Sequence, residues 1–429
     1  MTAVTRSVEG SGNVRAMTTT ESGAKDIDPH VDLDVEEIMQ RDIGAAHYGG
    51  FRPAGTYWAM FDQLREEAPF FHSTDGPQGY WLFTRHEAVL QGRQSPNLFS
   101  ASSLVHYEPD PPYQWIPVML DPPEHAKYRQ LLSAHFSPGT IERMAGRVQQ
   151  RCREILDGLA ARTSCDFVQD FARIYPTTIF MELMGLPVSE APRFMAWEAL
   201  ILHGNPETDP DRSKAYQAML DVQDYFRVLA ARRRAEPADD LVSHLVQCTI
   251  DGVPLSEEDL LSTCLLMFMA GLDTVTAQLS YTFWHLATHP DDRRRIVEDP
   301  AIIPSALEEF LRYYAIVNTG ARATQDVVFQ GCPVKQGDMV LFPFASACRD
   351  ERSFDHALEF DIERTPNHHI AFGAGPHRCV GSHLARRELR VALEEWHQRI
   401  PDYRLAKGAE LIEHGGGVMG LENLPLVWD

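Results

Sequence analysis

One long apolar segment constrains the fold of this chain more than any other feature. The stretch "SEEDLLSTCLLMFMAGLDTVTAQLSYTFWHLATHP" begins at Ser256, a residue type that caps helix N-termini, and stops at Pro290. A helix of this length extends roughly 45–50 Å at 1.5 Å per residue. Because apolar residues occupy most sides of its middle part, we expect this helix to cross the protein interior.

Helical periodicity also governs most of the remaining chain. Apolar residues recur at helical spacing, or lie between helix start and stop signals, over residues 55–69, 121–136, 139–161, 170–185, 215–236, 303–314 and 382–400. Residues 79–92 are typical of a short strand followed by a helix. Apolar and polar residues alternate over 323–343, which predicts short antiparallel strands, and 408–429 is expected to form a last hairpin.

These patterns together predict a mainly α fold with minor β-structure. No internal repeat and no clear linker divides the chain. The first 27 residues are small and polar, so we expect residues 1–27 to be disordered and residues 28–429 to form a single domain.

Charge and composition exclude several functional classes. A net charge of -22 argues against nucleic-acid binding, and a site for an acidic partner must then be a local basic patch. The longest apolar run, Leu260 to Leu272, is shorter than the about 20 residues that a membrane span needs, so we expect no membrane insertion. The seven cysteines show no CxxC spacing, which argues against a disulfide framework and against a zinc site. Free cysteines are expected in a reducing cytoplasm, so we expect the protein to be cytoplasmic.

The stretch "FGAGPHRCVG", from Phe372 to Gly381, sets Cys379 in unusual surroundings. Its glycines allow tight turns and the close approach of a flat ligand. The helix expected after Gly381 points its N-terminus at the loop, which favours a thiolate, a good ligand for soft metals. Two other interpretations stay open on these residues alone: a structural cysteine beside a turn, and a catalytic thiol with His377 or His383 as its base.

Three stretches taken together resemble the cytochromes P450. The cysteine loop matches the haem-binding loop of that family, "AGLDT" (270–274) looks like its oxygen-activation segment, and "EFLR" (309–312) is similar to its Glu-x-x-Arg pair. The first is a specific signal, whereas an i,i+3 ion pair on a helix is commonplace. All three follow the family's order and spacing, over roughly residues 30–429. "LDPPEHAKYRQLL", "HLARRE" and "LPLVWD" are similar to the soluble bacterial members related to the camphor-hydroxylating enzyme.

The resemblance implies the cytochrome P450 fold, with the long helix over haem b (iron protoporphyrin IX). Cys379 would be the thiolate ligand of the iron, and Phe372 would pack on the haem near the sulfur. The haem carboxylates need cationic or donor partners, which by position are His125, Arg129, His377 and Arg322. Arg322 stands one residue later than the family pattern places it.

The resemblance also assigns roles on the long helix and around the substrate. Thr274 would hydrogen-bond the oxygen being activated and Asp273 would relay protons from solvent, whereas Glu309 and Arg312 would be structural. The expected substrate-binding residues are Leu266, Met269, Ala270, Val317, Val418 and Tyr113. Tyr113 matches a tyrosine that donates a hydrogen bond to a substrate carbonyl in the camphor-hydroxylating enzyme. An apolar lining predicts a hydrophobic substrate.

The activity that the resemblance implies is a soluble, monomeric, cytoplasmic monooxygenase. It would hydroxylate a small hydrophobic molecule such as a terpenoid with O2. Electrons would come from NAD(P)H through a ferredoxin reductase and a [2Fe-2S] or similar ferredoxin, which would dock on Arg129, Arg378, Arg386 and Arg387. Two alternatives remain: a peroxygenase that uses hydrogen peroxide, and a non-catalytic haem-binding sensor. The adjacent Asp273 and Thr274 favour O2 activation over both.

Overall fold

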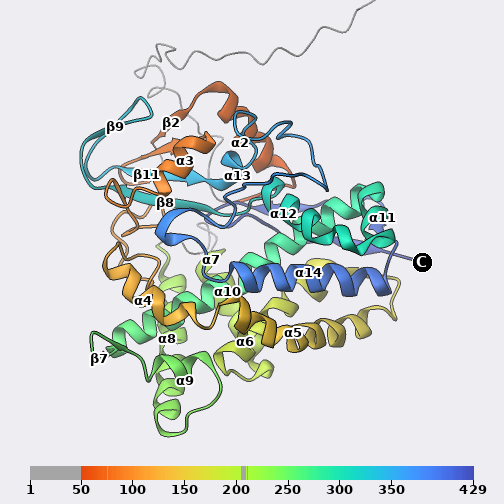
Figure 1. Cartoon of the computed structure of the whole chain (residues 1–429), viewed down its shortest axis with the longest axis horizontal. Helices are drawn as coiled ribbons and strands as arrows, with labels where there is room; N and C mark the ends of the chain where they lie inside the picture. The colour runs from red at the N-terminus through yellow and green to blue at the C-terminus, as the bar shows by residue number, and fades with distance from the viewer. Residues whose placement is uncertain (1–49, 75, 204–208, 210) are drawn as a thin grey trace, which may run out of the picture.

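The long helix predicted from the sequence crosses the centre of the molecule. The computed structural model describes residues 50–429 except 75, 204–208 and 210, so the predicted disordered segment 1–27 lies outside the described residues. Helix α10 (Glu257–Thr288) begins where Ser256 accepts a hydrogen bond from the backbone N–H of Asp259 at 3.0 Å. Its middle is buried nearly all round, and α6, α8 and α14 pack against it (Figure 1).

Helices make up most of the described fold, which confirms the mainly α prediction. They surround α10 on its lower and right-hand sides in Figure 1, with α14 running beside it and α5 packed against α14. Besides α10, the α-helices of the described residues are α2 (Thr56–Glu67), α3 (His86–Arg93), α4 (Glu124–Ser133), α5 (Pro138–Leu159), α6 (Ile174–Met184), α7 (Ala191–Leu202), α8 (Ser213–Ala235), α9 (Leu241–Leu245), α11 (Pro290–Glu298), α12 (Ile303–Tyr313), α13 (Phe344–Ala347) and α14 (Ser382–Arg399).

The largest sheet contains a parallel pair that the sequence did not predict. Its order is β2–β3–β11–β8–β4, with strands Phe70–Ser73, Tyr80–Phe83, Met339–Pro343, Asn318–Ala323 and Phe99–Ser100. The antiparallel strands predicted over 323–343 are present, since β9 (Val327–Phe329) pairs antiparallel with β10 (Cys332–Val334) and β11 with β8, but β11 also pairs parallel with β3. The alternation of apolar and polar residues over 323–343 predicts strands but not their partners, so it could not indicate parallel pairing with a strand as distant in the chain as β3.

The C-terminal strands bring the end of the chain against α10. The predicted hairpin forms between β13 (Ile412–His414) and β14 (Gly420–Leu421), and β14 packs on α10. β15 (Pro425–Val427) instead leaves the hairpin and pairs with β12 (Arg404–Leu405) and β5 (Ser164–Asp166). The remaining strands are β1 (Phe51–Pro53), which pairs with β13, and the short hairpins β6–β7 (Thr249–Ile250, Val253–Pro254) and β9–β10 (Val327–Phe329, Cys332–Val334).

Glu309 and Arg312 of α12 form a fully buried ion pair rather than a surface pair. Their side chains are 0% exposed, and Arg312 Nη2 lies 2.7 Å from Glu309 Oε1. Arg312 also donates to the carbonyls of Cys348 and Ala357, both at 2.8 Å. Glu309 accepts hydrogen bonds from the backbone N–H of Asp361 and from the side chains of Arg364 and Asn367. The pair thereby fastens the segment that leads into the cysteine loop.

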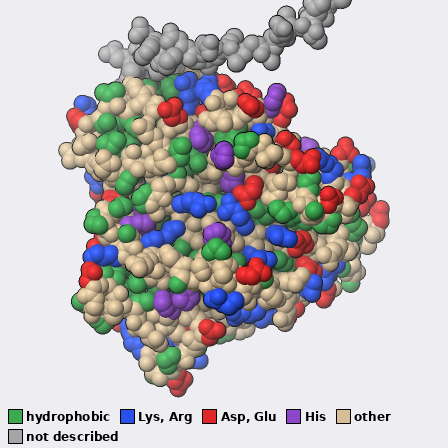
Figure 2. Space-filling model, viewed as in Figure 1, with side chains coloured by type: hydrophobic (Ala, Val, Ile, Leu, Met, Phe, Trp, Pro, Cys, Tyr) green, Lys and Arg blue, Asp and Glu red, His purple; other side chains and the backbone are tan. Residues whose placement is uncertain are grey.

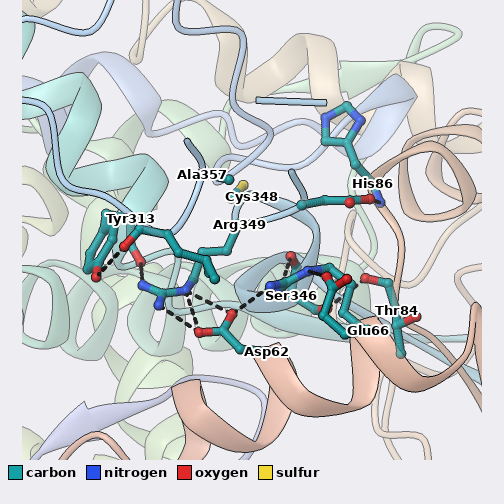
Figure 3. Close-up of polar contacts among 12 residues, drawn as sticks. Asp62, Glu66, Thr84, His86, Tyr313, Ser346, Cys348, Arg349 and Ala357 are labelled. Atoms are coloured by element: carbon teal, nitrogen blue, oxygen red, sulfur yellow. Dashed lines mark hydrogen bonds and ion pairs between the residues drawn. The ribbon is translucent and has the colours of Figure 1, made fainter. Parts of the chain in front are cut away.

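A second charged network joins α2 to the same region (Figure 3). Arg349 donates to the Asp62 carboxylate of α2 at 2.7 Å and reaches the Tyr313 carbonyl at the end of α12 at 3.4 Å. Arg65 is fully buried, lies 2.9 Å from Asp62 and donates to the Ser346 carbonyl of α13 at 3.1 Å. The Asp62 carboxylate and its two arginine partners therefore join α2, the end of α12 and α13.

The buried pair on α12 gives a stability prediction. Arg312→Ala will lower the free energy of unfolding by about 3–5 kcal/mol, because it breaks a buried ion pair, leaves the carbonyls of Cys348 and Ala357 without their donor, and leaves Glu309 with Arg364 as its remaining charged partner. Urea denaturation followed by circular dichroism measures the change. Arg390→Ala is the control, since it removes a 2.7 Å pair with Glu394 on the surface of α14, where the loss should stay below about 1 kcal/mol. Equal losses in the two variants would contradict the anchoring role.

Candidate active site

A largely apolar cavity of about 340 Å³ lies between α10 and the cysteine loop. Leu266, Ala270 and Thr274 reach it from one face of α10, and Phe372 and Cys379 reach it from the loop. Side chains of α6, α14 and the segment after α12 complete the wall. The cavity therefore brings together the two stretches, "AGLDT" and "FGAGPHRCVG", that the sequence singled out.

The backbone of the loop is shaped by its contact with α3. Gly375 has φ +67, and a Cβ added there would lie 2.4 Å from the Arg93 carbonyl oxygen, so a side chain is excluded. The backbone N–H of Cys379 donates to the Phe372 carbonyl at 2.8 Å, which closes the turn. Arg386 lies over the Phe372 ring, 4.5 Å from its centroid.

In the structure, burial also affects the ionisation of the Cys379 thiol, an effect that the sequence argument did not include. Burial raises the pKa of the Cys379 thiol above its usual value, although the backbone N–H of Gly381 and the charge of Arg129 lower it. Gly381 caps the N-terminus of α14, so this helix start favours the thiolate against the effect of burial. A metal ion coordinated by Cys379 would favour the thiolate further, because a coordinating thiol loses its proton to the metal.

One region of the cavity wall carries a cluster of cationic and donor side chains. His125, Arg129 and His377 line the cavity, and the rings of His125 and His377 lie 4.2 Å apart. Neither ring nitrogen of His377 has a hydrogen-bond partner among the described residues. Burial, together with the nearby Arg93, lowers the pKa of His377 to about 3. Buried donors without partners fit a ligand that brings carboxylates into the cavity.

Arg93 belongs to this cluster, and sequence reasoning missed it. It is 7% exposed and lines the cavity, where burial lowers its pKa to about 10 against the opposing charge of Asp121. In the sequence Arg93 stands at the end of an ordinary short helix, before "QSPN". Only the packing of α3 under the cysteine loop brings it inside, so no local signal marks it.

Thr274 and Asp273 lie on different sides of α10. Thr274 lines the cavity, and its hydroxyl donates to the Ala270 carbonyl at 3.1 Å. Asp273 is outside the cavity lining, 5% exposed, with Oδ1 3.3 Å from Nε2 of His203 at the end of α7. Burial alone would raise the pKa of Asp273, but the His203 charge and hydrogen bond hold it below its usual value. Burial opposes protonation of His203, yet Asp273 and Glu198 raise its pKa well above 6.5.

Only some of the predicted substrate-binding residues line the cavity. Leu266, Ala270 and Val317 do so, and the sequence missed other lining residues, namely Pro117, Val118, Phe180, Leu183, Ile316, Thr319 and Phe344. Met269 is buried outside the lining, and Val418 forms a β-bridge with Val317. These lining residues come from elements that are distant in the chain, so no sequence pattern identifies them before the fold is known.

Tyr113 and Arg322 have other partners in this structure. The Tyr113 hydroxyl donates to the Glu108 carboxylate at 2.9 Å, and its ring stacks on Trp115. Arg322 pairs with Asp110 at 2.8 Å. Neither residue lines the cavity, so the geometry does not support a substrate contact for Tyr113 or a carboxylate contact for Arg322.

The basic residues expected to dock a redox partner are partly neutralised. Lys and Arg side chains gather across the middle of the face that α14 presents (Figure 2). Of the four predicted docking residues, Arg386 pairs with Glu308 at 2.6 Å, and Arg387 pairs with Glu142. Arg378 is exposed, and Arg129 donates to its carbonyl oxygen. Arg129 and Arg378 are therefore the two predicted docking residues whose charge is not paired with a described acidic side chain.

Among the described residues, α10 is the one helix long and apolar enough to cross a membrane. Most of it is packed inside the protein, since 78% of its most apolar window is buried. A central helix of a folded core has the same length and composition, so this finding is weak evidence for a membrane span.

Comparisons with known proteins agree with this geometry. The family model "Cytochrome P450" matches residues 50–399. The probable cytochrome P450 127A1 of Sinorhizobium fredii is 35% identical over 370 residues, covering 84% of this chain and 87% of that protein. The mycinamicin IV hydroxylase/epoxidase of Micromonospora griseorubida is 34% identical over 357 residues, covering 81% and 89%. The crystal structure of CYP101J2 superposes with a TM-score of 0.80 at 28% identity, covering 89% of this chain and 95% of that one.

The His203–Asp273 pair gives a pH-dependent prediction. A raised histidine pKa means that the pair stabilises the fold fully below pH 6.5, and that this stabilisation is lost as pH rises through the folded-state pKa. The destabilisation caused by His203→Gln will therefore be largest near pH 6 and decline toward pH 9, measured by urea denaturation in metal-free buffer. His135→Gln is the control and should show the opposite trend, because burial lowers the His135 pKa. A pH-independent effect of His203→Gln would contradict the ion pair.

Proposed function

The chain belongs to the cytochrome P450 family, which makes it a haem-thiolate monooxygenase, and we propose that it hydroxylates a small hydrophobic molecule with O2. The observation that carries this proposal is that Cys379 and Thr274 line one largely apolar cavity. A cysteine supplies the metal ligand, a hydroxyl supplies a positioned hydrogen-bond donor, and the apolar wall holds substrate by shape.

We propose that Cys379 is the iron ligand and that Phe372 packs beside it. Thiolate ligation pushes electron density through the haem iron and favours O–O bond cleavage. The haem carboxylates are assigned to the cluster of Arg93, His125, Arg129 and His377, whose buried donors gain charged acceptors there. Arg322 is left out of this set because Asp110 already holds it.

Proton delivery is assigned to the two adjacent residues of α10. Thr274 Oγ1 carries a proton on the cavity side, where it now donates to the Ala270 carbonyl. Asp273 stands behind it, in contact with His203 at 3.3 Å, and takes protons from that side of the helix. The His203 side chain is 16% exposed, so this route reaches solvent.

The substrate and the electron donors are proposed more broadly. The apolar lining favours a hydrophobic molecule, and terpenoids are the first class to screen because of the resemblance to the camphor-hydroxylating enzyme. We propose that a separate [2Fe-2S] or similar ferredoxin, reduced by NAD(P)H through its reductase, docks at Arg129 and Arg378. We also propose that the enzyme is a cytoplasmic monomer; the seven cysteines are all free, which fits a reducing compartment.

A binding screen followed by turnover tests the proposal as a whole. Hydrophobic compounds that enter the cavity should shift the ferric haem spectrum by displacing its water ligand. The compounds that bind should then be hydroxylated with O2, NAD(P)H, reductase and ferredoxin. Faster turnover with hydrogen peroxide would favour a peroxygenase, and binding without product by either route would favour a sensor.

The metal-ligand assignment gives a spectroscopic prediction. Cys379→Ser will abolish the thiolate-type absorption of the reduced, carbon monoxide-bound protein, because the hydroxyl is a far weaker donor to iron. The control is Cys248→Ser, which changes a half-buried thiol outside the cavity lining and should leave the spectrum unchanged. An unchanged thiolate-type spectrum in the Cys379 variant would refute the assignment.

The role of Thr274 gives a kinetic prediction. Thr274→Ala will lower the product formed per O2 consumed at least about tenfold, with the remainder released as hydrogen peroxide, because positioned proton donors contribute factors of this size or more. Oxygen-electrode and product measurements give the ratio. Thr263→Ala is the matched control. The Thr263 hydroxyl donates to the carbonyl four residues before it, at Asp259, as the Thr274 hydroxyl does to Ala270, but Thr263 lies outside the cavity lining. A parallel loss in both variants would indicate a helix defect instead.

A further inference from the structure

A group of carboxylates and histidines lies behind α10, outside the haem cavity. Its members come from four separate parts of the fold: Glu198 of α7 and His203 at its end, Asp273 of α10, His414 of β13 with Glu422 after β14, and Arg173 before α6. Ionisable side chains gathered from so many elements require an explanation beyond the proton route through His203 and Asp273 alone.

The distances within this group match those of a metal centre. His203 Nε2 lies 3.2 Å from Glu198 Oε1 and 3.3 Å from Asp273 Oδ1. Two ligands at 2.0–2.1 Å from a tetrahedral zinc ion lie about 3.3 Å from each other. The ligand atoms of His203, Asp273 and His414 all lie within 4.8 Å of one another, and the two histidine rings are 4.1 Å apart.

Two of the ligand atoms are buried without a partner. Within the described part of the chain, neither His414 Nε2 nor Asp273 Oδ2 has a hydrogen-bond partner, and these residues are only 7% and 5% exposed. His414 Nδ1 lies 2.6 Å from the Glu422 carboxylate, which leaves the Nε2 lone pair available. A histidine that donates one ring N–H to a carboxylate and offers the other nitrogen is typical of a metal ligand. Gly420 makes room for this ring, since a Cβ there would lie 2.8 Å from Nε2.

The charge of the group calls for a cation. Three carboxylates face a single guanidinium, Arg173, which lies 3.5 Å from Glu198. With both histidines as neutral ligands, a divalent cation would cancel the two remaining negative charges.

We propose that His203, Asp273 and His414 form a binding site for a divalent transition metal, for which zinc fits the ligand set best, with Glu198 in contact with His203 beside it. Glu422 orients His414, and Arg173 orients Glu198. A metal ion bound to His203 Nε2 takes the place of the hydrogen bonds that this nitrogen makes with Glu198 and Asp273. Because the 16% exposed His203 side chain forms the outer wall, a metal ion reaches the site from solvent.

Metal binding has a consequence for catalysis that rests on the proposed function. A zinc ion on Asp273 withholds that carboxylate from proton transfer and occupies the route through His203. The metal-loaded enzyme is then the slow form, and release of the metal restores turnover. Zinc therefore acts here as an inhibitor at a site separate from the haem and the substrate.

Equilibrium dialysis of the haem-loaded, EDTA-treated protein against zinc tests the site. One zinc per chain is expected, with at least tenfold weaker binding in His414→Ala and Asp273→Asn, and a weakening of about tenfold in Glu422→Gln. Zinc-edge X-ray absorption should show imidazole nitrogen and carboxylate oxygen at about 2.0–2.1 Å. The haem spectrum of each variant checks that it has folded. No bound zinc, or zinc held equally well by the His414 and Asp273 variants, would overturn the proposal.

A second histidine pair provides the matched control. The rings of His135 and His244 lie 4.2 Å apart, but His244 Nε2 contacts the Leu131 carbonyl and the Cys248 thiol instead of a carboxylate. His135→Ala should leave zinc binding unchanged, and a loss there would move the site to that pair. Turnover measured with and without zinc then separates the two claims. Binding without inhibition would refute the proton route through Asp273 while the metal site stands.

Discussion

Arg312 is fully buried and uses its donors on Glu309 and on carbonyls of the chain that leads to the cysteine loop. The loop itself has little regular structure, so its position depends on what holds the segment before it. Glu309 binds that segment as well, through the backbone N–H of Asp361 and the Asn367 side chain. One buried ion pair thus fixes the distance between α12 and the cavity wall that carries Cys379. Breaking it would leave Glu309 with Arg364 as its remaining charged partner and the carbonyls of Cys348 and Ala357 without their donor, so the arrangement is costly to disrupt.

α10 is the second constraint, because it separates two environments with adjacent residues. Successive residues of a helix point about 100° apart, so Thr274 lines the apolar cavity while Asp273 contacts His203 at the end of α7. A cavity that binds a hydrophobic molecule excludes the water that would otherwise supply protons. Placing the carboxylate on the other side of the helix keeps the charge out of the cavity but within one residue of it.

The sequence predicted the parts of the site that lie close together in the chain. Local residue order predicted the turn around Cys379, the helix that follows it and the long apolar helix that carries Thr274, whereas the roles of the two residues followed from the resemblance. His125 and His377 followed from the resemblance, whereas Arg93 did not, because its inward position arises from the packing of α3 under Gly375. The parallel pairing of β3 with β11 and the engagement of Tyr113 by Glu108 are equally non-local. Such features depend on contacts between elements that are distant in the chain, and the sequence of a single segment does not predict those contacts.

The ionisable group behind α10 was likewise not predictable from the sequence. None of its members stands near another in a pattern that indicates a metal, since α7, α10 and the last hairpin each contribute one or two side chains. Their meeting point places Asp273 in contact with a partly exposed histidine and beside a second, unpartnered imidazole nitrogen. Protons and divalent metals compete for the same lone pairs. If Asp273 delivers protons as proposed, the contacts that suit it to that role are also the contacts that would let a metal ion bind it and inhibit the enzyme.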